Sequence, residues 1–201
     1  MRIDRQTAIS LVSFVAISLI FFAPLKPFSI WRVSRSDALQ MKPGSINGAF
    51  SRKQNLNSEA LRHYFEANQT ALRQEFSGVA SPLSALAEHI RTYVKMPEGH
   101  PGRRVCMLMK TVINTKAAEP ELWHQAKGYI AAARGDIASV LAAAKRLGEL
   151  PDDANCENLA RRFQANLGAL RVEFQQSDDA DGLAQLAEDM ANEIEHLRIP
   201  D

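Results

Sequence analysis

Apolar residues are concentrated near the N-terminus of the chain, where they predict a membrane-spanning helix. No charged residue occurs between Gln6 and Leu25, and nearly every position from Ile9 to Phe22 is apolar. A helix over residues 7–25 would be about 28 Å long, close to the thickness of the hydrocarbon core of a bilayer. Pro24 lies where such a helix should end. The pattern therefore predicts an N-terminal membrane anchor at residues 1–25.

A cleaved signal peptide is the alternative interpretation of this segment, because Arg2 and Arg5 precede the apolar run. Cleavage after Ala23 would place the large side chain of Phe21 where a small residue is required, and Pro24 follows directly. An uncleaved anchor is therefore favoured.

The charges that flank the predicted anchor give conflicting indications of its orientation in the membrane. Residues 26–45 hold four Lys/Arg, against two in the N-terminal flank, which favours a cytoplasmic C-terminal side. A six-residue N-terminus is, however, a poor candidate for export, and long domains often cross the membrane despite nearby charge. We expect an extracytoplasmic (periplasmic) C-terminal domain, with a cytoplasmic-facing domain as the alternative.

Beyond the anchor, residues 26–57 show no sustained periodicity and predict a basic linker, whereas residues 58–198 predict a helical domain. Ser81 followed by Pro82 has the form of an N-cap and a first helical residue. The run around Val105–Met109 fits either a strand or a helix, and we interpret it as helix because no second strand-like segment could pair with it. Further helices are predicted to start at Pro120, at Ile137, after Asp153 and after Asp179.

Short connections group these helices into hairpins over 58–96, 120–149 and 153–198. We therefore predict an all-α fold, in which a single N-terminal transmembrane helix precedes a helical-hairpin bundle or a short α-solenoid-like domain. The middle hairpin has Trp123 near its start, then Gly128, a Gly135-Asp136 turn and a Leu-Pro-Asp ending. With these features residues 121–153 resemble a single tetratricopeptide repeat, although Trp123 lies one position early. The resemblance implies binding of a protein or peptide in a concave groove.

The charge of the chain is balanced overall but unevenly distributed. The net charge of +1 argues against a dedicated nucleic-acid binder. Residues 26–148 nevertheless hold 18 Lys/Arg and nine Asp/Glu, whereas residues 149–201 hold four and 13. The acidic C-terminal region either pairs with the basic helices or leaves a free surface that steers a basic partner. The candidate partner-binding residues are Asp178, Asp179, Asp181, Glu188, Asp189, Glu193 and Glu195.

No constellation of residues indicates catalysis, so we predict that the chain is not an enzyme and binds no cofactor. Glu193 and His196 have the i, i+3 spacing used in di-iron bundles, but such sites need two of these pairs, and no metal site is predicted. Cys106 and Cys156 are both expected to face the core. A disulfide between them and two free buried thiols are equally supported.

These features predict a membrane-anchored helical interaction module, an adaptor or accessory subunit of an envelope membrane complex. Its partners would be proteins and, through residues 7–25, the lipid bilayer, with no nucleic acid. A ligand-sensing helical bundle is the alternative.

Overall fold

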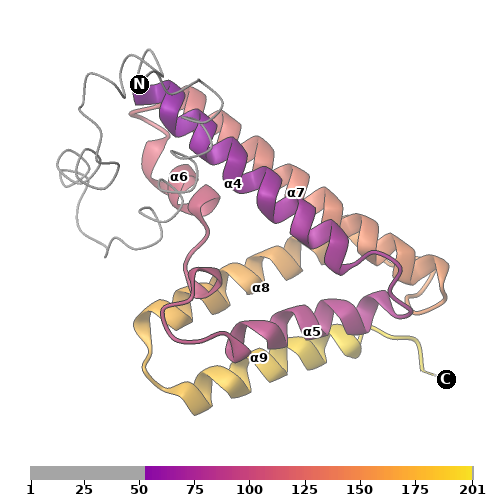
Figure 1. Cartoon of the computed structure of the whole chain (residues 1–201). Helices are drawn as coiled ribbons and strands as arrows, with labels where there is room; N and C mark the ends of the chain where they lie inside the picture. The colour runs from indigo at the N-terminus through magenta and orange to yellow at the C-terminus, as the bar shows by residue number, and fades with distance from the viewer. Residues whose placement is uncertain (1–52, 201) are drawn as a thin grey trace, which may run out of the picture.

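The computed structural model describes residues 53–200, in which every regular element is a helix (Figure 1). The anchor predicted at residues 1–25 and most of the predicted linker lie outside the described residues. Across the described part of the chain, no helix has both the length and the apolar character needed to span a bilayer. The elements are α4 (Lys53–Glu75), α5 (Pro82–Lys95), the 3-10 turn η2 (Pro101–Arg103), α6 (Met107–Thr115), α7 (Pro120–Arg146), α8 (Cys156–Gln176) and α9 (Ala180–Glu195).

Several helices begin at the predicted capping residues. The hydroxyl of Ser81 accepts a hydrogen bond from the backbone N–H of Ser84 at 3.2 Å, at the start of α5. The carboxylate of Asp179 accepts one from the N–H of Gly182 at 3.0 Å, at the start of α9. Such bonds satisfy amides that have no partner within the helix. These predictions of capping residues are confirmed. The ambiguous run forms helix only from Met107, where α6 begins with two buried residues, and Val105 and Cys106 precede the helix.

The break predicted at Arg134-Gly135-Asp136 is wrong, because α7 runs without interruption from Pro120 to Arg146. Asp136 does not cap a second helix. Its carboxylate instead accepts hydrogen bonds from Gln69 at 2.7 Å and from Arg73 at 2.9 Å, both on α4. Since residues 121–146 form one helix, they cannot form a helical hairpin, and the tetratricopeptide resemblance of residues 121–153 is wrong.

The continuity of α7 can be tested by replacing Gly135 with alanine. No atom lies within 4 Å of a Cβ placed there, so the substitution should raise the free energy of unfolding by about 0.5–1 kcal/mol, since alanine favours helix. Gly128→Ala should raise the stability in the same way, because Gly128 is also helical and has no atom within 4 Å of an added Cβ. Gly148→Ala should lower the stability of the protein, because Gly148 has a φ of +77°. Urea unfolding followed by circular dichroism measures all three. A loss of stability in Gly135→Ala would indicate a turn instead of a helix.

The helices pack as neighbours in space that are often distant in sequence (Figure 1). α4 lies along α7, α5 lies along α9, and α8 contacts α7. The main core lies where α5, α7, α8 and α9 meet, and its fully buried side chains include Leu83, Leu86, Ile90 and Leu170. A second cluster joins α4, α6 and α7 through Leu61, Tyr64, Phe65, Met107, Leu108 and Ala126.

Glu149, between α7 and α8, connects the C-terminal end of the chain to the start of α5 through hydrogen bonds. Its buried carboxylate accepts a hydrogen bond from the N–H of Leu83 at 3.0 Å and one from the guanidinium of Arg198 at 2.8 Å. Burial raises the pKa of Glu149, but hydrogen bonds from Ser81, Leu83 and Arg198 outweigh this effect and hold the pKa below its ordinary value. The charged form is therefore the one that stabilises the fold.

We expect Glu149→Gln to lower the free energy of unfolding at neutral pH by about 1–3 kcal/mol, because hydrogen bonds to the charged carboxylate are lost. A group whose pKa falls on folding contributes stability above its unfolded pKa and loses it as the pH falls through the folded pKa. The difference between wild type and variant should therefore shrink as the pH falls below 4.5. Denaturant unfolding at several pH values measures it, with Glu98→Gln in an exposed loop as the control. A difference that does not change with pH would contradict this role.

Candidate functional site

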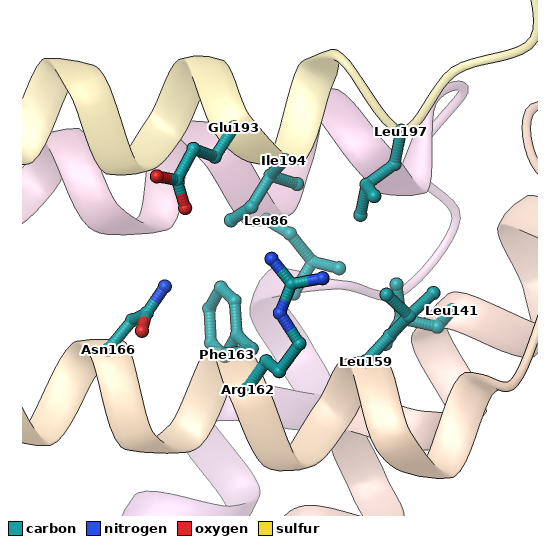
Figure 2. A pocket seen from close by; sticks show the side chains of 9 residues that line it. All are labelled: Leu86, Leu141, Leu159, Arg162, Phe163, Asn166, Glu193, Ile194 and Leu197. Atoms are coloured by element: carbon teal, nitrogen blue, oxygen red, sulfur yellow. The ribbon is translucent and has the colours of Figure 1, made fainter.

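A shallow groove between α8 and α9 has an apolar floor and a polar edge (Figure 2). Arg162 and Asn166 of α8 and Glu193 of α9 provide the polar groups. Its volume of about 30 Å³ has room for a water molecule, whereas pockets for small organic ligands measure roughly 300–1,000 Å³. The groove is thus too small to be the principal ligand site. Its lining consists of Leu86, Leu141, Leu159, Arg162, Phe163, Asn166, Glu193, Ile194 and Leu197.

The acidic residues predicted as a partner surface are partly used inside the molecule. Glu188 and Glu195 of α9 both form ion pairs with Arg91 of α5, at 2.8 and 3.0 Å. The hydrogen bonds from Arg91 lower the pKa of Glu188. Internal pairing, one of the two explanations offered for the charge distribution, therefore accounts for these two residues.

The other five acidic residues do not share one arrangement. Asp179 caps α9, Asp189 accepts a hydrogen bond from Gln185 at 2.8 Å, and Glu193 lines the groove. Asp178 and Asp181 are exposed.

The sequence predicts no metal site, and it leaves a disulfide and two free thiols as equally supported alternatives for Cys106 and Cys156. The described residues contain no group of three or more side chains able to hold a metal ion. Cys106 and Cys156 are free thiols. Cys106 packs against the second cluster, whereas Cys156 begins α8 and packs against the main core.

The most unusual polar feature is a cluster of four side chains, which we call the Arg171 cluster: Tyr64, Tyr93, Cys106 and Arg171. They come from α4, α5, the residue that precedes α6, and α8. Arg171 donates a hydrogen bond to the Tyr93 hydroxyl at 2.5 Å, and its guanidinium carbon lies 4.9 Å from the centre of the Tyr93 ring. The Tyr64 hydroxyl donates to the Cys106 thiol at 3.5 Å. The two tyrosines are 7% and 5% exposed.

A chain of polar contacts connects the cluster to the surface. The Tyr93 hydroxyl lies 3.4 Å from Nε2 of His89, and Nδ1 of His89 lies 2.8 Å from the Glu75 carboxylate. The Glu75 side chain is 42% exposed. The Glu75 carboxylate therefore lies at the solvent-exposed end of this series of contacts, and the side chains of His89 and Tyr93 separate it from Arg171.

The cluster is electrically positive and rich in hydrogen-bond donors. An arginine keeps its charge in proteins, so Arg171 is a cation. Burial raises the pKa of Tyr64, and burial also raises the pKa of Tyr93, although the Arg171 cation opposes the shift. Both hydroxyls are consequently protonated at neutral pH. A further cation, Lys110, follows Cys106 by one helical turn, and burial together with the nearby Arg104 lowers the pKa of Lys110.

Arg171 is the residue that the sequence analysis missed, although the sequence holds a signal for it. It follows Phe163 by eight positions and Leu167 by four, which places it on the inner face of α8. A charged residue at a core position is the informative departure from the apolar stripe.

Residues 82–190, more than half of the chain, match the family model described as "Tetracyclin repressor-like, C-terminal domain". No curated protein sequence matches the chain.

Solved structures match over nearly the whole length. A TetR-family transcriptional regulator from Cytophaga hutchinsonii is similar at 14% identity and a TM-score of 0.80, with all of both chains covered. One from Agrobacterium tumefaciens is similar at 16% identity and a TM-score of 0.77, with 94% of this chain and 98% of that chain covered. A cysteine mutant of the TetR-family regulator CifR, complexed with 26-base-pair operator DNA, is similar at 21% identity and a TM-score of 0.71, with 96% and 97% covered.

These findings overturn the functional predictions made from the sequence. The membrane-anchored adaptor, its partners in an envelope complex, the exclusion of nucleic acid and the periplasmic membrane location are wrong, because the matches are to transcriptional regulators. The hairpin bundle or short solenoid is also wrong, since the fold is that of TetR-family regulators. The apolar run suggested an anchor because its length and composition alone meet the requirement for a bilayer span.

Proposed function

Because the chain belongs to the tetracyclin repressor-like C-terminal domain family, we propose that it is a transcriptional regulator that binds DNA and responds to a small molecule held in its C-terminal domain. The observation that carries the proposal is the combination of this family match with fold similarity to regulators over 94–100% of the chain. One similar protein was solved with operator DNA. The proposal assigns no catalytic reaction to the chain.

The charge distribution supports DNA binding by the part of the chain that precedes the C-terminal domain. Residues 26–53 hold six Lys/Arg and a single acidic residue, Asp37. Lysine and arginine neutralise backbone phosphates and release counterions, which supplies much of the affinity of proteins for DNA. The acidic residues at 149–201 offset this positive charge in the net charge of the whole chain. DNA binding does not require this acidic region to contact DNA.

The Arg171 cluster supports the second half of the proposal. It lies among α4, α5, α6 and α8, and all of these helices except α4 fall within the residues matched by the family model. Buried polar groups that converge inside a helical domain are typical of a ligand site. A ligand-sensing helical bundle was the alternative function suggested by the sequence, and it agrees with the findings better than the adaptor does.

DNA binding can be tested by selection from a library of random-sequence duplexes. The full chain is immobilised, bound duplexes are recovered over several rounds at near-physiological salt, and the recovered pool is sequenced. We expect one sequence motif to be enriched. A pool that stays random after repeated rounds would contradict the proposal.

A further inference from the structure

The guanidinium of Arg171 is a largely buried cation that has no anionic partner among residues 53–200. It forms no ion pair with any described residue, and its Nε nitrogen is buried with no hydrogen-bond partner among them. Burying a charge costs free energy unless a counter-charge and hydrogen bonds compensate. Tyr93 supplies one hydrogen bond and a ring face, which compensate only in part.

The described side chains that act most strongly on Arg171 add donors but no negative charge. The groups that interact with its charge are Tyr93, Cys106 and Tyr64. The Tyr64 hydroxyl already donates to Cys106, and the Tyr93 hydroxyl lies beside His89. The buried donor that is left without an acceptor among the described residues is therefore Nε of Arg171. A carboxylate fits this arrangement, because a guanidinium binds a carboxylate through two parallel hydrogen bonds.

We propose that the Arg171 cluster binds a small molecule through a carboxylate, which pairs with the guanidinium of Arg171. The rest of the molecule would face the second cluster, in which Tyr64 packs with apolar and aromatic side chains. This assignment rests on the proposed function only in that the bound carboxylate would be the effector of a DNA-binding regulator.

Met109 of α6 is the side chain that can make room for such a ligand. Gly168 lies one helical turn before Arg171 on α8, and the thioether of Met109 fills the space beside it. A Cβ at Gly168 would lie 2.9 Å from Cε and 3.2 Å from Sδ of Met109. Methionine is flexible and adapts to irregular spaces, so its displacement is less costly than that of a rigid side chain.

The test uses the full chain with two carboxylates, benzoate and octanoate, and their neutral amides, benzamide and octanamide, as probes. Binding is followed by thermal unfolding and by the rate at which iodoacetamide alkylates Cys106, with Cys156 as the internal reference. At least one carboxylate should raise the unfolding temperature and slow the alkylation of Cys106 by about threefold or more at saturation, without affecting Cys156. Its amide should bind at least about tenfold more weakly, since it cannot pair with the guanidinium.

Variants at one position identify the group that holds the carboxylate. Arg171→Met should fold, because it replaces a buried charge with an apolar side chain, and it should weaken carboxylate binding about tenfold or more. Arg171→Lys keeps the cation and should retain part of the affinity, which provides a second test if the methionine variant folds poorly. Arg161→Met, on the exposed face of the same helix, is the matched control and should bind as wild type does.

Equal binding of carboxylate and amide, binding by neither carboxylate, or full carboxylate binding by both Arg171 variants would overturn the assignment. Failure of the site can be told apart from failure of the proposed function, because DNA binding is measured separately. Carboxylate binding by a chain that selects no DNA motif would leave the site standing and remove the regulator. Selection of a DNA motif by a chain that binds no carboxylate would leave the regulator standing and remove the carboxylate site.

Discussion

Replacing Leu86 with alanine is expected to lower the free energy of unfolding by about 2–5 kcal/mol. Leu86 is 0% exposed and lies on α5, within the main core where α5, α7, α8 and α9 meet. It also forms part of the floor of the groove between α8 and α9 (Figure 2). The substitution removes buried methyl groups and leaves a cavity, and helices held from several sides cannot close around it fully.

Denaturant unfolding followed by circular dichroism measures the effect of Leu86→Ala. Leu147→Ala is the matched control, because Leu147 is 60% exposed at the end of α7, and it should change the stability by less than about 0.5 kcal/mol. If the two variants lost similar amounts of stability, α5 would not pack in the core as described.

The predictions that succeeded depended on interactions between residues close in sequence. Ser81 caps α5 and Asp179 caps α9 through bonds to amides three positions later. A side chain and an amide three residues apart are in reach whatever the rest of the chain does, so the local pattern is sufficient.

The continuity of α7 could not be predicted from the same local signals. Gly135-Asp136 has the form of a C-cap followed by an N-cap, but tertiary contacts decide the outcome. Ile137, Ala138 and Leu141 are buried in the main core, and burial of this kind outweighs the cost of about 1 kcal/mol for a glycine within a helix.

The Arg171 cluster and the proposed DNA partner were missed for two different physical reasons. The hydrogen bond between Arg171 and Tyr93 joins residues 78 positions apart, so only the packing of α5 against α8 brings them together. The exclusion of nucleic acid relied on the net charge of +1, a sum that hides a basic region followed by an acidic one. DNA phosphates interact with the charges that lie near them. The net charge of the whole chain is therefore not informative when positive and negative residues are separated along the sequence.

The second large effect is expected in DNA binding. Replacing Lys42 and Arg52 together with alanine should weaken the affinity of the full chain for its selected duplex about tenfold or more and reduce the dependence of that affinity on salt, since fewer counterions would be released. Arg161→Ala, in the acidic C-terminal region, should leave both quantities unchanged. An unchanged affinity in the double variant would exclude these two residues from the DNA contact.

The central claim, that the chain is a sequence-specific DNA-binding regulator, is tested most directly by comparing two duplexes of equal length and composition. Fluorescence anisotropy at about 0.15 M salt gives the affinity of the full chain for the selected motif and for the same bases in shuffled order. We predict that the selected duplex binds at least about 1,000-fold more tightly, as specific regulators do. Equal affinities for the two duplexes, or no measurable binding to either, would contradict the claim.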